Sequence, residues 1–166
     1  MPIIGTPRSF HDRHRFVVEV PGLSYSGFEK CSELKASVTL REHYEGGSSL
    51  AHKGPGRIKV DNITLERGAT ADLQMYNWFS QVADLAEGIG QVDPHFKRDL
   101  SIVQLSRSGG ELLRWNVYGA FPIEFTAGEW DNTSDEVVIT KLALAIDYFQ
   151  AQVSSSSSSG GRQDVA

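Results

Sequence analysis

The chain has 166 residues, of which 40% are hydrophobic, and its formal net charge is −5. This length and composition fit one soluble domain with its own core, and the acidic net charge argues against nucleic acid as the main partner while leaving room for a local basic patch. Cys31 is the single cysteine, so no intrachain disulfide can form and nothing indicates an oxidising compartment.

Residues 1–14 are predicted to form a polar N-terminal arm. They lack the continuous apolar stretch of a secretory signal, and no window of the sequence reaches the ~18 apolar residues of a membrane span. We therefore expect synthesis in the cytoplasm and no direct membrane insertion. His11 and His14 lie close together, but no matching pair of ligands elsewhere would complete a metal site.

Two early segments are predicted to be β-strands because apolar and polar residues alternate in them. In the run RFVVEV from Arg15, every second residue from Phe16 is apolar, and Pro21-Gly22 ends the pattern. The run that ends at Tyr44 has apolar residues at even positions and polar residues between them, which predicts a strand with one buried face. Its apolar members are Ala36, Val38, Leu40 and Tyr44.

A glycine-rich break separates that strand from the next one, and the next one changes phase. The stretch REHYEGGSSLAHKGPGRIKVDNITLERG covers residues 41–68. In its second half the apolar residues Ile58 and Val60 are even, whereas Ile63 and Leu65 are odd. A one-residue slip would invert the strand, so a bulge or sharp bend is predicted at Asp61-Asn62.

Residues 70–87 are predicted to form a helix that begins at Thr70 or Asp72 and ends at Gly88 and Gly90. The predicted core-facing stripe consists of Leu73, Tyr76, Phe79, Val82, Ala83 and Ala86. Such a stripe is more often a packing face than a cofactor pocket.

The remaining elements are predicted to be strands. A turn at Arg107-Ser108-Gly109-Gly110 joins two of them, and the run EVVITKLALAIDYFQ is read as a buried strand although its spacing also suits a helix. The fold class is therefore mainly β with one helix, arranged as a two-layer sandwich or barrel-like domain over residues 15–150. Residues 151–166, rich in serine and glycine, are predicted to be a flexible tail.

Searches for chemistry along the chain find no catalytic, cofactor-binding or metal-binding set. Lys53 precedes Gly54 and a strand follows, so the glycine-rich break does not fit a phosphate-binding loop. No G-x-S-x-G elbow is present. The acidic turn around Asn132 does not have the spacing of an EF-hand, and Cys31 shows no sign of an activated thiol.

Several short motifs occur in the order typical of one protein family. They are Tyr44, Glu45, Gly46, Gly47, then Lys53, Pro55, Gly56, then Ile63, Leu65, Arg67, Gly68, followed by Asp72, Leu73 and Trp78. A later tryptophan strand runs into Ala120-Phe121-Pro122, and an acidic turn precedes the last strand. Over roughly residues 15–150 the chain resembles the tube proteins of contractile tails, including T-even phage tail tubes and the inner tubes of phage-tail-like injection systems.

The resemblance implies a non-enzymatic subunit that forms six-membered rings, stacked into a hollow tube inside a sheath. It implies a sheath protein, baseplate or spike hub proteins, and a cargo or tape-measure protein in the lumen as partners, and an assembled particle as the final location. It leaves open a main tube or a tube-initiating baseplate subunit. The long hairpin is implied to help rings stack, with these candidate contact residues: Arg41, Tyr44, Glu45, Gly46, Gly47, Lys53, Pro55, Gly56, Arg57, Lys59 and Arg67.

The alternative function is a small β-sandwich module that binds a ligand, such as a carbohydrate, through Trp78, Trp115 or Trp130. That function requires exposed tryptophans, whereas the tube hypothesis expects at least Trp115 to be buried between the sheets.

Overall fold

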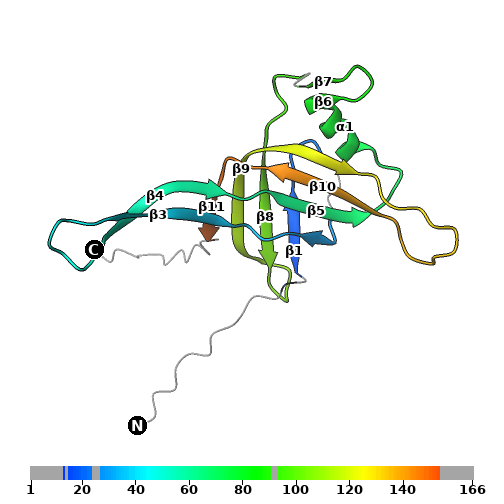
Figure 1. The fold of residues 1–166 in the computed structure, drawn as a ribbon. Helices are drawn as coiled ribbons and strands as arrows, with labels where there is room; N and C mark the ends of the chain where they lie inside the picture. The colour runs from blue at the N-terminus through cyan, green and yellow to red at the C-terminus, as the bar shows by residue number, and fades with distance from the viewer. Residues whose placement is uncertain (1–12, 14, 24–26, 91–92, 154–166) are drawn as a thin grey trace, which may run out of the picture.

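The computed structural model describes residues 13, 15–23, 27–90 and 93–153, and it has the predicted mainly β architecture with one helix (Figure 1). The long strands are β1 (Phe16–Glu19), β3 (Ala36–His43), β4 (His52–Val60), β5 (Ile63–Gly68), β8 (Arg98–Leu105), β9 (Glu111–Thr126), β10 (Ile139–Ala145) and β11 (Tyr148–Val153). The short strands are β2 (Lys30–Cys31), β6 (Ala83–Asp84) and β7 (Ile89–Gly90), and the helix α1 spans Gln74–Val82.

The body of the domain is one seven-stranded antiparallel sheet that folds into two layers. Its strand order is β1-β8-β9-β10-β5-β2, and β11 pairs with β9 beside this path. The first half of β9 pairs with β8 and β11, whereas its second half pairs with β10. Figure 1 shows β5 and β10 running across the direction of β1 and β8, so the two layers cross as in orthogonal sheet packing.

The change of layer along β9 occurs at Gly119, whose φ is +66°. A Cβ at this position would collide with the Asp147 carboxylate, and the Gly119 amide donates to Asp99 Oδ1 at 3.0 Å. Asp147 lies between β10 and β11, and its amide donates to the Tyr118 carbonyl oxygen at 3.0 Å. The final apolar run is therefore two strands that bend where β9 bends, instead of the one strand predicted.

The core lies between the two layers and is made of apolar side chains from both. It comprises Val18, Val20, Leu23, Phe28, Ile63, Leu65, Met75, Trp78, Leu100, Ile102, Val117, Ala120, Leu142, Leu144 and Ile146. The predicted alternation of the first strand is confirmed, because Val18 and Val20 are buried. Burial of this apolar surface is the main stabilising contribution to the fold.

The predicted irregularity at Asp61-Asn62 is a break between two sheets. β4 ends at Val60 and pairs only with β3, whereas β5 begins at Ile63 and pairs with β10 and β2. The phase slip in the sequence thus marks the point where the chain leaves a solvent-exposed hairpin and enters the core. Lys35 and Lys59 lie 3.9 and 3.5 Å from the Asp61 carboxylate at this junction.

The helix is shorter than predicted, and its most buried face is rotated from the predicted stripe, of which Phe79 still packs partly against the core. It starts at Gln74, whose amide donates to Asp72 Oδ1 at 2.9 Å, and it ends at Val82 because the next two residues pair with β7. Met75 and Trp78 are its buried residues, whereas Leu73 and Tyr76 from the predicted stripe are exposed. The domain boundary predicted after residue 150 lies within β11, which continues to Val153. The terminal residues 1–12, 14 and 154–166, which include His11 and His14, lie outside the described residues.

Candidate interaction surfaces

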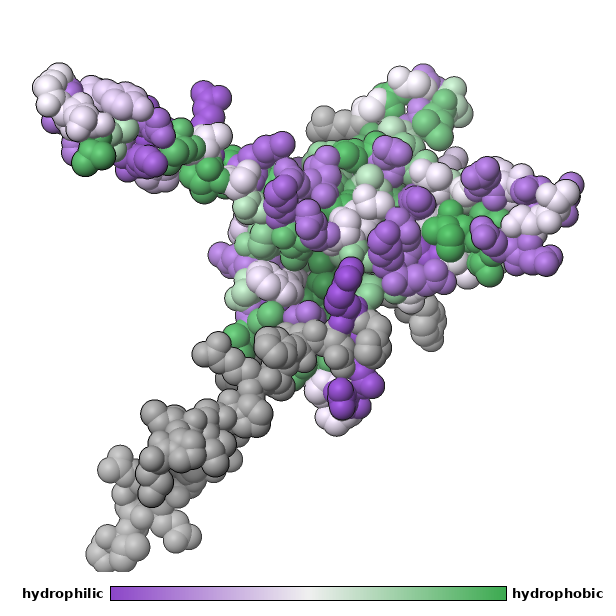
Figure 2. All heavy atoms as spheres, turned by 60° about the horizontal axis from the view of Figure 1, so that its bottom comes forward, coloured by the Kyte–Doolittle hydropathy of each residue, from purple (hydrophilic) through white to green (hydrophobic). Residues whose placement is uncertain are grey.

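The most prominent surface feature is the hairpin formed by β3 and β4, here called the arm (residues 36–60). It projects from one end of the body in Figures 1 and 2. All eight residues of β3 are exposed, so the prediction that this strand has a buried face is wrong for the single chain. Alternation of apolar and polar residues predicts a strand with one apolar face, but it does not predict whether the same chain or a partner covers that face.

The two faces of the arm differ in chemistry. Val38 is the register partner of Ile58, and Leu40 is the partner of Pro55, so these side chains share one face. Val38, Leu40 and Ile58 are 53%, 60% and 74% exposed. The arm is therefore a two-stranded ribbon with an uncovered apolar side, a structure that is only marginally stable without a partner surface.

The opposite face of the arm is polar and basic. It carries Ser37, Lys59 and Arg41, each one position out of phase with the apolar set. The strand irregularity lies at Thr39, which accepts a hydrogen bond from the Arg57 amide at 2.7 Å and donates from Oγ1 to the Arg57 carbonyl oxygen at 3.3 Å. Arg41, Lys53 and Arg57 form no ion pair with any described residue.

The tip of the arm contains the residues that the sequence singled out. A turn joins Glu45 to Ser48, whose amide donates to the Glu45 carbonyl oxygen at 3.1 Å. Gly47 has a φ of +91°, a conformation that explains its glycine. The structure places these predicted contact residues on the arm: Arg41, Tyr44, Glu45, Gly46, Gly47, Lys53, Pro55, Gly56, Arg57 and Lys59.

Arg67 is the exception among the predicted contact residues. It lies in β5 and is 6% exposed, with its Nη1 at 3.6 Å from Asp72 Oδ2 and its Nη2 donating to the Asp72 carbonyl oxygen at 3.2 Å. It therefore connects β5 to the start of α1 inside the domain and is not part of the exposed surface.

A second surface lies at the other end of the body, in the connection between β9 and β10. This segment, here called the acidic loop, covers residues 127–138 and contains four carboxylates and no lysine or arginine. Asp131 fixes its shape, because its Oδ1 accepts from the Thr133 amide at 2.9 Å and from Thr133 Oγ1 at 2.7 Å. These hydrogen bonds lower the pKa of Asp131 and keep it ionised.

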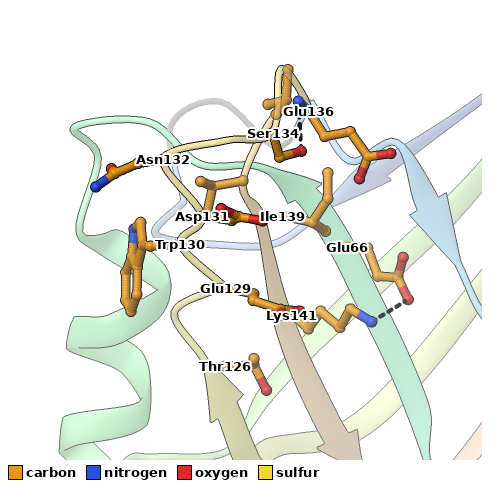
Figure 3. Close-up of a pocket in the computed structure, with 13 residues that line it drawn as sticks. Glu66, Thr126, Glu129, Trp130, Asp131, Asn132, Ser134, Glu136, Ile139 and Lys141 are labelled. Atoms are coloured by element: carbon orange, nitrogen blue, oxygen red, sulfur yellow. Dashed lines mark hydrogen bonds and ion pairs between the residues drawn. The ribbon is translucent and has the colours of Figure 1, made fainter.

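The acidic loop borders a hollow of about 560 Å³ (Figure 3). Lys141 is the one lysine or arginine among the residues that line this hollow. Its Nζ lies 3.8 Å from Glu66 Oε1, so its charge is already paired with that of Glu66. The loop carboxylates form no ion pair with any residue that the structure describes. They are Glu129, Asp131, Asp135 and Glu136.

Trp130 projects from the acidic loop towards α1 in Figure 3 and is 74% exposed. A second hollow, of about 420 Å³, lies beneath it and is lined in part by Leu73, Tyr76 and Phe125. Leu73 and Tyr76 are themselves exposed, at 62% and 39%. This end of the domain therefore combines uncovered apolar side chains with carboxylates that form no ion pair with a described residue. From the sequence this segment is predicted only as an acidic turn, although a tryptophan inside a run of carboxylates without a lysine or arginine is a signal for a surface of this kind.

A third hollow, of about 340 Å³, opens beside β1 and includes Cys31, Trp115 and Phe149 in its lining. Burial raises the pKa of Cys31 to about 11, so its thiol stays protonated and is a poor nucleophile near neutral pH. Within residues 13, 15–23, 27–90 and 93–153, no three His, Cys, Asp or Glu side chains are grouped to hold a metal ion. No described helix is long and apolar enough to cross a bilayer.

The three tryptophans occupy three different environments. Trp78 is fully buried, Trp115 is half-buried against the core and Trp130 is exposed. Of the three, Trp130 alone has the exposure that the alternative ligand-binding function requires, and Trp78 is excluded as a ligand contact by its burial. The tube hypothesis expects Trp115 to be buried between the sheets, and this expectation is met only in part. Trp115 packs against the core but is half-buried, and it also lines the third hollow.

Comparisons with known proteins agree on one family. The family described as T4-like virus tail tube protein gp19 matches residues 12–150. No curated protein sequence matches the chain.

Three solved structures share the fold. A chain of the PVC sheath-tube complex, from an extracellular contractile injection system in the extended state, is 27% identical with a TM-score of 0.74 and covers 90% of this chain and 94% of that chain. A chain of the PVC sheath/tube terminator is 27% identical with a TM-score of 0.77, covering 89% and 100%. A chain of the anti-feeding prophage tube-terminating cap is 26% identical with a TM-score of 0.73, covering 92% and 99%.

Proposed function

The chain belongs to the T4-like virus tail tube protein gp19 family, and we propose on that basis that it is a structural subunit of the inner tube of a contractile tail or injection system. The family match over residues 12–150 is the observation that carries the proposal. The similar chains in sheath-tube and tube-terminator assemblies support it. The family is structural, so the proposal includes no substrate turnover.

The proposed assembly is a six-membered ring that stacks on further rings, with the arm as the stacking element. The exposed apolar face of the arm supports this role, because a two-stranded ribbon gains stability when a partner covers it. The proposed contact residues are those of the predicted set that are exposed on the arm, and Gly56 and Arg67 are omitted because they are half-buried and buried. They are Arg41, Tyr44, Glu45, Gly46, Gly47, Lys53, Pro55, Arg57 and Lys59.

The proposed partners beyond the chain itself are a sheath protein, baseplate or spike hub proteins, and a cargo or tape-measure protein in the lumen. The proposal covers both the main tube and a tube-initiating baseplate subunit, because chains from the sheath-tube complex and from the tube terminators match at nearly equal identity, 26–27%, so identity does not separate one position in the tube from another. We propose synthesis in the cytoplasm followed by incorporation into the assembled particle.

Shortening the arm tests its role. Arg41 and Gly54 are register partners, so an Asn-Gly turn in place of residues 42–53 closes the hairpin between paired positions. All replaced residues except Ala51 are exposed, so the free energy of unfolding should change by no more than about 1 kcal/mol.

Negative-stain microscopy and light scattering of the purified full chain give the readout. The parent protein should form six-fold rings or tubes, and the shortened variant should keep the circular dichroism spectrum of the parent and lose stacked rings. A Ser108→Ala variant, in the exposed turn between β8 and β9, serves as the control and should assemble normally. Normal tubes from the shortened variant would refute the role of the arm, and a parent protein that stays monomeric at high concentration would refute the tube function.

A further inference from the structure

The arm and the acidic loop have opposite charge. Residues 36–60 contain four Lys and Arg against two Glu, a net charge of +2, whereas residues 127–138 have a net charge of −4. This separation occurs within a chain whose total charge is −5. Oppositely charged patches steer association and set the register of a contact between proteins.

The two surfaces also match in their apolar parts. The arm exposes Val38, Leu40 and Ile58, and the loop end exposes Trp130 together with Leu73, which immediately precedes the neighbouring α1. On the loop end the apolar patch lies beside carboxylates that form no ion pair with a described residue. On the arm the apolar and basic side chains lie on the two faces of one narrow ribbon, and Arg41, Lys53 and Arg57 form no ion pair with a described residue, whereas Lys59 is paired with Asp61. Burial of apolar area would supply the affinity of a contact, and the surrounding charges would supply its selectivity.

The arm and the acidic loop lie at opposite ends of the molecule. In Figures 1 and 2 the arm reaches away from the body on one side, and the β9–β10 connection reaches away on the other. β4 has nine residues, so the arm extends roughly 30 Å at about 3.3 Å per residue. The arm points away from the loop of its own chain, so a contact between these surfaces has to join two copies.

From these observations we infer that the acidic loop and the Trp130 patch of one copy form the docking site for the arm of the next copy. The contact uses two different surfaces of the same chain and is therefore heterologous. Heterologous contacts propagate head to tail and close into rings or continue as open stacks, according to the rotation between copies. This inference rests on the proposed tube function and names the partner surface of the arm.

Charge reversal on each surface, followed by their combination, tests the inference. The arm variant carries Arg41→Glu and Arg57→Glu, which change the arm from +2 to −2, and the loop variant carries Glu129→Lys, Asp135→Lys and Glu136→Lys, which change the loop from −4 to +2. These five side chains are exposed and make no ion pair with a described residue, so both variants should keep the circular dichroism spectrum and melting temperature of the parent. A variant with Glu29→Lys, Glu33→Lys and Glu87→Lys changes the total charge as the loop variant does, at exposed sites outside both surfaces.

The measured quantity is the protein concentration at which half of the chain is assembled, from sedimentation at low salt. We expect each reversal alone to raise this concentration at least about tenfold, which corresponds to about 1.4 kcal/mol. The control variant should stay near the parent value. An equimolar mixture of the arm and loop variants, and the chain with all five substitutions, should recover most of the lost assembly, because a negative arm then meets a positive loop.

The outcomes separate this inference from the proposed function. If the parent assembles and the single-surface reversals have no effect, or the combination restores nothing, then the arm docks elsewhere and the tube function stands. If the parent itself never forms rings or tubes, the proposed function is wrong and the inference falls with it.

Discussion

Replacing Trp78 by phenylalanine tests how the helix is attached to the sheet. Trp78 is fully buried, and its indole Nε1 donates to the Phe96 carbonyl oxygen at 2.9 Å. The Arg98 guanidinium lies over the ring, with Cζ 5.0 Å from its centroid. One side chain thus ties α1 to the segment that leads into β8.

The expected loss of stability follows from these contacts. Phenylalanine cannot donate the hydrogen bond, and leaving the Phe96 carbonyl unpaired costs about 1–2 kcal/mol. The smaller ring leaves a void of about 40 Å³, which at about 24 cal/mol per Å³ costs about 1 kcal/mol. A weaker cation–π contact with Arg98 contributes about 0.5 kcal/mol. The free energy of unfolding should therefore fall by about 2–4 kcal/mol.

Urea denaturation followed by far-ultraviolet circular dichroism measures this change, at a concentration below the onset of assembly. Trp130→Phe is the matched control, because the same substitution at a 74% exposed position should change the free energy of unfolding by no more than about 0.5 kcal/mol. Equal unfolding midpoints for the two variants would refute the reasoning, since they would mean that the buried indole adds nothing beyond an exposed one.

Two further predictions concern Cys31 and Gly119. Burial raises the pKa of the Cys31 thiol from 9.0 to about 11, so the folded protein should resist iodoacetamide at pH 8 until urea unfolds the chain. Because the folded state holds this proton more tightly than the unfolded state, the free energy of unfolding should fall as pH rises from 9 to 11. A Cys31→Ala variant should lose this part of the pH dependence. Gly119→Ala forces a Cβ against Asp147 at a positive φ, which should displace the Asp147 carboxylate from Lys97 Nζ, now 3.0 Å away. The melting temperature should fall, at a cost of about 1–3 kcal/mol in the free energy of unfolding. Gly110→Ala is the control, because the φ of Gly110 is not positive and the nearest contact of an added Cβ is a serine hydroxyl at 3.4 Å. An unchanged melting temperature for Gly119→Ala would contradict the assignment of the bend.

The sequence predicted the strands whose alternation coincides with burial, and it failed where packing decides. The first strand follows its pattern because Val18 and Val20 reach the core. The slip at Asp61-Asn62 was readable because the two halves of that run face different surroundings. The helix face was not readable, because the Trp78 contact with Phe96 sets its rotation and no local spacing records that contact.

The candidate surfaces were predictable to different degrees. The arm was found from its glycines and flanking strands, but the same pattern wrongly included Arg67, whose charge is used inside the domain by Asp72. For the acidic loop, the sequence predicts an acidic turn and does not indicate an interaction surface. Its relation to the arm depends on the two segments lying at opposite ends of the body, which is a property of the folded chain.

The junction at Asp61-Asn62 also determines how the domain carries mechanical load. Figure 1 shows β5 continuing from the arm in nearly the same direction, and β5 holds β10 through six consecutive register pairs, from Ile63↔Leu144 to Gly68↔Ile139. A pull along the arm is therefore directed along β5 and loads these pairs together in shear. The ladder would yield much more easily if it were peeled open one pair at a time, so this connection suits a hairpin that transmits axial force into the core.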